Sequence, residues 1–253
     1  MKKILCAVII GFLLPLSQAQ VGMIPIVDSG VPAPPAASAF VQGFTDPNFT
    51  FTTPHTIGSF SGSTTAHNTI IVVITAANNF VTPVISDTQG NTFTTIESLT
   101  TSGTCFCYVV AAAFNIVGGA DTVSISWGGG NSISSNSVAE YTCTATCGVD
   151  VHTSTHVSPT WVEPSTVGPL TATVSDIALT VIAGTTSATG TTWPEPTATG
   201  YTNHNGVNDN NTTGRGSKIA DKNIGAGAFS ATWTSTIPQP SGESWLVLIG
   251  IHH

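Results

Sequence analysis

Apolar and polar residues alternate along most of this chain, and this two-residue period limits its possible folds more than any other feature. The stretch DTVSISWGGG (residues 121–130) places valine, isoleucine and tryptophan at every second position, and AFSATWTST (residues 228–236) repeats the arrangement with phenylalanine, alanine and tryptophan. Successive side chains of a β-strand point to opposite faces, so such a segment buries one face only. Beyond residue 38, no segment of useful length has the i, i+3, i+4 spacing of an amphipathic helix. The sequence therefore predicts an all-β protein.

Strand-like runs rich in β-branched and aromatic residues recur about every 8 to 12 residues, separated by Gly, Asn, Asp, Ser and Pro. This spacing is typical of an antiparallel β-sandwich of the jelly-roll or immunoglobulin-like type. The strands that we expect are Phe49–Thr53, Ile70–Ala76, Thr82–Asp87, Thr92–Ser98, Cys105–Phe114, Thr122–Trp127, Ser137–Cys143, Leu170–Val174, Ile177–Ala183, Thr197–His204, Ser217–Lys222, Ala228–Thr234 and Ser244–His252.

Several landmarks occur twice, in the same order and at nearly the same distance. The runs IIVVITA and IALTVIA begin at Ile70 and Ile177, which are 107 residues apart. Two further pairs keep offsets of 107 and 106 residues: Val138 with Trp245, and Trp127 with Trp233. We therefore expect an internal repeat of about residues 70–143 and 177–252, which forms two related halves of one β-sandwich domain at residues 39–253. Two separate small domains are the alternative.

The first 19 residues have the composition of a secretory signal peptide. Two lysines precede an apolar run at residues 4–16, and small residues follow at Ser17-Gln18-Ala19. The apolar run is too short for a stable membrane span, so we expect a secreted protein, extracellular or at the cell surface, without membrane insertion. Residues 20–38 contain four prolines among small residues and predict an extended N-terminal arm.

Few side chains are charged. The charged fraction is 7%, whereas an average soluble domain has roughly 25%. Two of the five basic residues lie in the leader, so the processed chain has three against 13 acidic ones and a net charge near −10. Because phosphate binding needs clustered Lys and Arg, nucleic acid is disfavoured as a partner. Thr, Ser, Asn and Gly must cover the surface, which suits simple exposure outside the cell or a polar face for glycans.

Four cysteines remain after removal of the leader, namely Cys105, Cys107, Cys143 and Cys147. In an oxidising compartment we expect them to form disulfides. Cys105 and Cys107 would lie about 7 Å apart on one face of a strand, where they are poorly placed to pair with each other. We therefore expect both to pair with Cys143 and Cys147. A zinc site is the alternative, although C-x-C and C-x3-C are not typical zinc spacings.

The stretches ISDTQGNTFTTI, YVVAAAFNIVGGADTVSISW and VAEYTC occur in this order, and together they resemble a β-sandwich module of bacterial exported proteins and phage tail or adhesion proteins. The similarity covers most of the chain from about Ile70 to Ile251. Its motifs are two tight turns and a strand: Asp87, Gly90 and Asn91; Gly118, Gly119 and Asp121; and Glu140-Tyr141. The resemblance implies a jelly-roll or immunoglobulin-like sandwich at a cell or virion surface. It brings no established activity, so it implies no catalytic residues. The second half departs from the pattern at Ala220-Asp221-Lys222.

The sequence contains no recognisable catalytic motif. The nearest match to G-x-S-x-G, at residues 58–62, has Phe60 in place of the nucleophile. Polysaccharide cleavage needs two facing carboxyl groups. No local motif pairs any of the candidate acids Asp87, Glu140, Asp176, Glu195, Asp221 and Glu243. Glu140 lies within an apolar strand, where an unpaired carboxylate would be costly, so we expect it at an edge or facing solvent with a hydrogen-bonded partner.

Three aromatic residues form a candidate ligand-binding platform. Trp161, Trp193 and Tyr201 lie in polar or Pro-flanked stretches outside the alternating runs. Aromatic rings in such positions are expected to be exposed, and exposed ring faces are typical of sugar-binding sandwiches. The other three tryptophans, Trp127, Trp233 and Trp245, are expected in the core because each occupies an apolar position of a strand.

One loop is a candidate metal site. The stretch GVNDNNTTGRG (residues 206–216) gathers Asn208, Asp209 and Asn210, and oxygen-rich loops of this kind can hold calcium. A flexible hairpin tip is the alternative. His152 and His156 would lie about 13 Å apart in a strand, so we do not expect them to share a metal.

These features predict an exported all-β protein that acts as a non-enzymatic surface or extracellular module, with a binding or structural role and a glycan as the candidate ligand. No cofactor other than calcium is expected, and the sequence does not specify an oligomeric state. The competing hypothesis is a secreted hydrolase or lyase that acts on polysaccharide. A groove with two carboxyl groups about 5 to 10 Å apart would favour the enzyme.

Overall fold

The described part of the chain forms β-strands and no helix, as the two-residue period predicts. The computed structural model describes residues 38–48, 50, 52–77, 83–100, 106–128, 132–143, 146–157, 164–186, 196–208, 214–235 and 242–252. The predicted leader and nearly all of the predicted arm lie outside this part. The described strands all lie within one compact unit of the chain, Pro35–His253.

The strands divide into two sets of eight along the described residues. The first set is β1 (Phe40–Asp46), β2 (His55–Ser59), β3 (Thr69–Ala77), β4 (Val84–Asp87), β5 (Thr94–Thr100), β6 (Phe106–Ala113), β7 (Thr122–Ser126) and β8 (Ser132–Tyr141). The second set is β9 (Gly148–Val157), β10 (Ser165–Ala172), β11 (Asp176–Thr186), β12 (Thr197–Ala198), β13 (Thr202–Asn208), β14 (Arg215–Ile224), β15 (Gly227–Thr234) and β16 (Gly242–His252).

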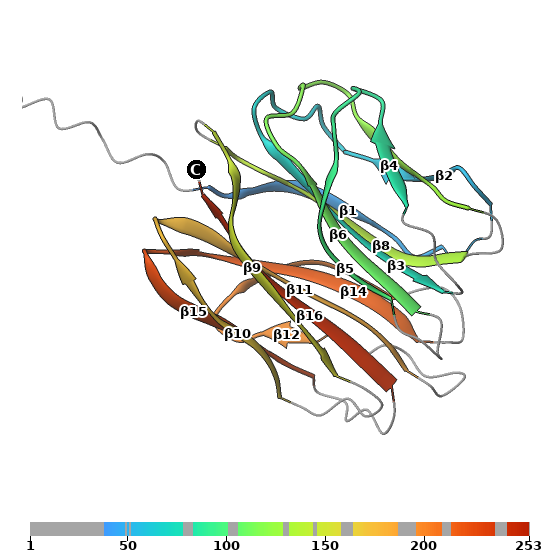
Figure 1. The fold of residues 1–253 in the computed structure, drawn as a ribbon. Helices are drawn as coiled ribbons and strands as arrows, with labels where there is room; N and C mark the ends of the chain where they lie inside the picture. Colours follow the sequence, from blue (N-terminus) through green and yellow to red (C-terminus); the bar gives the residue numbers. More distant parts are fainter. Residues whose placement is uncertain are drawn as a thin grey trace, which may run out of the picture. The chain divides into compact units, whose positions relative to one another are not determined.

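Both sets have the same topology. In the first half, large sheet 1 has the order β1-β8-β3-β6-β5, and small sheet 1 has the order β2-β7-β4. In the second half, large sheet 2 has the order β9-β16-β11-β14-β13, and small sheet 2 has the order β10-β15-β12. Adding eight to each strand number converts the first half into the second. The two related halves are therefore confirmed, with each half a sandwich of one large and one small antiparallel sheet (Figure 1).

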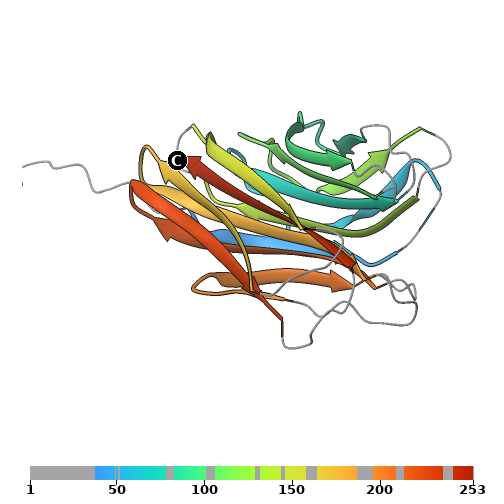
Figure 2. The ribbon, with the colours of Figure 1, turned by 60° about the horizontal axis from the view of Figure 1, so that its bottom comes forward.

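Each large sheet is buried on both faces. One face packs on the small sheet of its own half, so that Ile70 and Ile125 belong to one core cluster in the first half, and Leu248 and Trp233 to another in the second. The opposite faces of the two large sheets bury one shared core, in which the ring of Tyr108 stacks on that of Trp245 at 5.7 Å between centroids. The central strands therefore appear in the sequence as unbroken apolar runs such as IIVVITA and WLVLIGI. The strands of the two large sheets can be followed in Figure 2.

The residue-to-residue correspondence between the halves differs from the predicted offset of 107. Ile70 faces small sheet 1, whereas Ile177 faces the shared core. Since side chains alternate along a strand, an odd offset between these strands exchanges the two faces. An offset of 108 instead relates Ile70 to Ala178. Ile70 pairs with Glu140, and Ala178 pairs with Gly250. In both halves the edge strand, β1 or β9, has a bulge beside this pair.

The other predicted landmarks divide in the same way. Val138 packs toward small sheet 1 and Trp245 into the shared core, so they are not equivalent positions. Trp127, directly after β7 of small sheet 1, and Trp233, on β15 of small sheet 2, are at an even offset, and both face the large sheet of their own half. All three tryptophans that the sequence places in the core are buried.

The predicted strands differ from the observed ones in three places. Instead of Phe49–Thr53, the structure has β1 before this segment and β2 after it. The segment Thr197–His204 is divided into β12 and β13 by a turn at Gly200, whose φ is +74°. The sequence predicted no strand between residues 144 and 169, where β9 and most of β10 lie.

Of the two tight turns quoted for the first half, the one at Asp87 is present: Gly90 has a φ of +75°, and the backbone N–H of Asn91 donates to Asp87 Oδ1 at 2.9 Å. The segment quoted as the second turn instead forms a β-bridge between Gly119 and Thr64. A Cβ at Gly118 would lie 2.4 Å from the backbone nitrogen of Ala66, so only glycine fits there. The backbone N–H of Val117 donates to Asn91 Oδ1 at 2.7 Å and joins the two segments.

Candidate functional site

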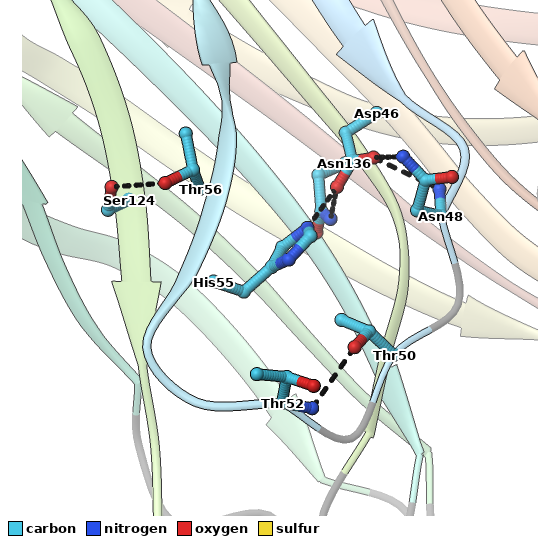
Figure 3. Close-up of polar contacts among 8 residues, drawn as sticks. All are labelled: Asp46, Asn48, Thr50, Thr52, His55, Thr56, Ser124 and Asn136. Atoms are coloured by element: carbon cyan, nitrogen blue, oxygen red, sulfur yellow. Dashed lines mark hydrogen bonds and ion pairs between the residues drawn. The ribbon is translucent and has the colours of Figure 1, made fainter.

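A buried aspartate and a histidine meet where the two sheets of the first half join. Asp46 ends β1, His55 begins β2, and the Nε2–H of His55 donates to Asp46 Oδ2 at 2.7 Å. Asn136, opposite Asp46 on β8, donates from Nδ2 to the same oxygen at 3.3 Å. The backbone and side-chain amides of Asn48 donate to Oδ1 at 3.0 and 2.7 Å. Figure 3 shows these donors converging on the carboxylate, which thereby links large sheet 1 to small sheet 1.

An Asp–His pair acts in nucleophilic catalysis when a hydroxyl or thiol hydrogen-bonds to the second ring nitrogen. None of the hydroxyls drawn in Figure 3 is hydrogen-bonded to the ring of His55. Thr50 accepts from the backbone of Thr52, and Thr56 contacts Ser124. The geometry of this pair supports a link between sheets.

Glu140 is the centre of a second polar cluster in the first half. Its side chain is 0% exposed, so the expectation of an edge or solvent-facing position is wrong, whereas the expected hydrogen-bonded partner is present. Oε1 accepts from the backbone of Thr65 at 2.8 Å and from Asn68 Nδ2 at 2.6 Å, and Oε2 accepts from Gln42 Nε2 at 2.7 Å. Three donors offset the cost of burying this carboxylate.

The corresponding end of the second half holds two carboxylates, those of Asp150 on β9 and Asp176 on β11. They are close enough for one carboxyl to hydrogen-bond to the other. Thr173 donates from its backbone N and from Oγ1 to the two oxygens of Asp150, both at 2.7 Å, and the backbone hydrogen bond is the main reason that the pKa of Asp150 is lowered. Asp176 is 1% exposed, and burial, followed by the charge of Asp150, raises its pKa to about 6.

The two clusters are related by the offset of 108 residues. It pairs Thr65 with Thr173, and Asn68 with Asp176. Both threonines donate a backbone N–H to a carboxylate. Strand pairing places Gly250 opposite Ala178, where the first half has Glu140 opposite Ile70. A Cβ at Gly250 would lie 2.9 Å from Oδ2 of Asp176. The carboxylate of Asp176 therefore occupies space that a side chain on β16 would otherwise fill.

Three further histidine–carboxylate pairs involve the strands of large sheet 2. His152 lies 2.7 Å from Glu97, and His156 lies 2.8 Å from Glu243. The third pair joins His204 Nε2 to Asp221 Oδ2, and the ring of His204 stacks on Phe40 of the first half. Each histidine thus has its own carboxylate. Within the described ranges, no group of three or more His, Cys, Asp or Glu is placed to hold a metal ion.

The predicted cross-pairing of the cysteines is wrong. Cys143 and Cys147 form a disulfide with each other, and Cys107 is a free, buried thiol whose pKa is raised by burial. Cys107 pairs with Ala76 at one end of β3, whereas Cys143 follows Tyr141, which pairs with the other end. These ends are about 23 Å apart, too far for a disulfide. Cys105 lies outside the described residues.

The predicted binding residues lie in the core or outside the described residues. Tyr201 is 8% exposed, and its hydroxyl donates to the backbone oxygen of Ser230 at 2.9 Å, so the prediction of an exposed ring is wrong. Burial raises its pKa to about 12. The other two platform residues, Trp161 and Trp193, lie outside the described part. So do Asp209 and Asn210 of the candidate calcium loop and the side chain of Asn208.

The candidate acids are distributed over several separate pairs. Asp87 lies beside Asp121, which was not among the candidate acids of the sequence. Burial, followed by the charge of Asp87, raises the pKa of Asp121. Asp221 and Glu243 belong to the histidine pairs, and Glu195 lies outside the described residues. The sequence also missed Asp46, His55 and Asp150. Only the Asp46-Pro47-Asn48 turn has a local pattern that could have indicated a capped carboxylate.

Comparisons with known proteins give no match to any family model, curated protein or solved structure. Within the described ranges, no helix is long and apolar enough to cross a membrane.

Proposed function

We propose that this protein is a secreted, non-enzymatic module with a binding or structural role outside the cell, and that glycans are its ligand class. The observation that carries the proposal is the chemistry of the two small sheets, whose outward faces are formed largely by uncharged hydroxyl side chains. A disulfide between Cys143 and Cys147 agrees with an oxidising compartment.

Small sheet 2 is the better example of such a face. Its inward positions hold apolar residues, including Val167, Ala231 and Trp233. Thr166, Thr171, Thr197, Ser230, Thr232 and Thr234 occupy its outward positions. The hydroxyls of Thr166 and Thr232 lie 3.0 Å apart across neighbouring strands. Hydroxyls both donate and accept hydrogen bonds, so a fixed array of them can match the hydroxyls of a sugar chain.

The contacts among the acidic residues favour this proposal over the hydrolase or lyase. Glycosidases hold two carboxyl groups about 5 to 10 Å apart with the substrate between them. The aspartates of the pairs Asp87–Asp121 and Asp150–Asp176 are instead adjacent, so that the charge of Asp87 raises the pKa of Asp121 and the charge of Asp150 raises that of Asp176. Asp46 and Glu140 are held by several donors each and link strands.

A glycan array probed with the protein tests the proposal. The variant Thr166→Val/Thr232→Val removes two hydroxyls from small sheet 2 at constant shape, and we expect it to lose most of the binding at an unchanged melting temperature. Because small sheet 2 is the face tested, Thr56→Val/Ser124→Ala, which removes the matching contact from small sheet 1, serves as the control and should keep the binding of small sheet 2. Failure of every glycan on the array to bind the protein would contradict the proposal. Release of reducing ends from a polysaccharide would also contradict it and would favour the hydrolase. Trp193→Ala tests the predicted aromatic platform separately.

A further inference from the structure

The side chain of Asp176 is buried without a hydrogen-bond donor. It is 1% exposed, and neither of its carboxylate oxygens accepts a hydrogen bond from a donor among the described residues. Its neighbour is a second carboxylate, that of Asp150, whose oxygens take both donors of Thr173. An ionised carboxylate in this position is costly unless a positive group accompanies it.

The first half shows what a completed cluster looks like at the same place in the fold. Glu140 is the only carboxylate there among the described residues, and three donors surround it. At the position of the donor Asn68, the second half has Asp176, and at the position of Gln42 it has Val151. Compared with the first half, the second half lacks two donors and carries one more carboxylate at this place. A purely structural cluster would not need this combination.

We propose that Asp150 and Asp176 bind a divalent cation of the calcium class at this end of the second half. Calcium is bound by carboxylate, hydroxyl and backbone oxygens together with water, and two carboxylates neutralise its charge. The bulge of β9 at Asp150 and the glycine at position 250 bring the two carboxylates together. The residues of the connecting turn, Thr173 to Ser175, are exposed, so an ion can enter from solvent.

A histidine borders the two aspartates. His252 lies close enough to interact electrostatically with both of them, and its ring fits against Gly148, where a Cβ would lie 2.8 Å from its Cε1.

Thermal unfolding at pH 7.5 tests the proposal, with the protein in EGTA compared with the protein in 10 mM CaCl2. Extracellular calcium modules commonly bind with Kd of roughly 10⁻⁴ to 10⁻³ M. Saturation of one such site should raise the melting temperature by about 5 °C. Isothermal titration with CaCl2 should show one ion per chain, and 10 mM MgCl2 should give a smaller shift because Mg²⁺ requires tighter octahedral geometry.

Asp176→Asn is the decisive variant. It keeps the shape of the side chain and removes the charge, so the protein in EGTA should be at least as stable as the original while the calcium shift is lost. Asp121→Asn changes the buried member of the other carboxyl pair and should keep the full calcium response, as should Asp209→Asn in the predicted calcium loop.

Three results would overturn the proposal. The first is a melting temperature that calcium leaves unchanged, which would assign a shared proton to the Asp150–Asp176 pair. The second is a calcium shift that survives Asp176→Asn and disappears in Asp121→Asn or Asp209→Asn. The third is an equal shift with MgCl2 or with NaCl of matched ionic strength, which would indicate screening and no specific site.

Discussion

The buried carboxylates of this protein differ in the number of donors around them. Asp46 accepts from His55, Asn48 and Asn136, and Glu140 accepts from three side-chain and backbone donors. Because burial of an ionised group is unfavourable in the absence of such partners, each carboxylate fixes the position of the strands that supply its donors. Asp176 has no donor of this kind among the described residues, and this difference has measurable consequences.

Replacing Glu140 with alanine should lower the free energy of unfolding by about 3 kcal/mol, because it leaves the buried side-chain amide of Asn68 without its acceptor. Glu97→Ala is the control, because its contact with His152 is partly exposed and should be worth less than about 1 kcal/mol. Urea unfolding followed by tryptophan fluorescence measures both. Equal effects for the two variants would contradict the importance of the Glu140 cluster.

The raised pKa of Asp176 predicts a loss of stability with rising pH. Its folded pKa of about 6 lies above the ordinary value of 3.8, so the folded protein holds this proton more tightly than the unfolded chain does. The resulting stabilisation is fully present below about pH 3.8 and is lost as the pH rises through 6. In EGTA, the free energy of unfolding of the original protein minus that of Asp176→Asn should therefore decrease between pH 4 and 6.5. A difference that is constant across this range would show that Asp176 titrates normally.

At the scale of single strands, the sequence predicted the strands with a regular apolar face and missed those without one. IIVVITA and WLVLIGI are recognisable because both of their faces are buried, and DTVSISW because one is. β1 and β9 are edge strands whose residues are mostly half-buried on both faces, so FVQGFTD and GVDVHTSTHV show no clear alternation. A strand could be predicted from the sequence only where the burial of its side chains follows a regular pattern.

The candidate site was harder to predict because its contacts join distant residues. Gln42 and Glu140 are 98 residues apart, and Asp150 and Thr173 are 23 apart. Nothing in the local sequence of either aspartate indicates the other. The repeat was detectable, but β-strands resemble one another closely, so apolar matches placed Ile70 on Ile177 and exchanged the faces. The layer that each residue faces depends on its partners across the sheet.

The disulfide between Cys143 and Cys147 closes a loop directly after β8, whereas Cys107 lies inside β6. Peptide mapping without reduction should recover Cys143 linked to Cys147. Iodoacetamide should leave Cys107 unmodified in the native protein and alkylate it in denaturant, because the thiol is buried and its pKa is raised. Recovery of Cys107 linked to Cys143 or Cys147 would contradict the strand pairing of large sheet 1.

At the scale of the whole unit, the shared core makes the stability of each half depend on the other. Large sheet 1 and large sheet 2 bury apolar faces against each other that include Val73, Tyr108, Val181 and Trp245. A half without its partner would expose this face to water, which is unfavourable in proportion to the apolar area. The duplicated fold is therefore expected to unfold as one cooperative unit.

Two matched substitutions in the shared core test this dependence, one from each half. Ile71 on β3 and Ile249 on β16 are both 0% exposed. Ile71→Ala and Ile249→Ala should each lower the free energy of unfolding by about 3 kcal/mol through the cavity that they leave. In native-state hydrogen exchange, either variant should reduce amide protection in β3 and β11 together, since the two strands lose the same global stability. Thr232→Ala, on the outward face of small sheet 2, should change neither strand. Two separate transitions, with protection lost only in the half that carries the substitution, would show that the halves fold independently and that the contact between the large sheets contributes little to stability.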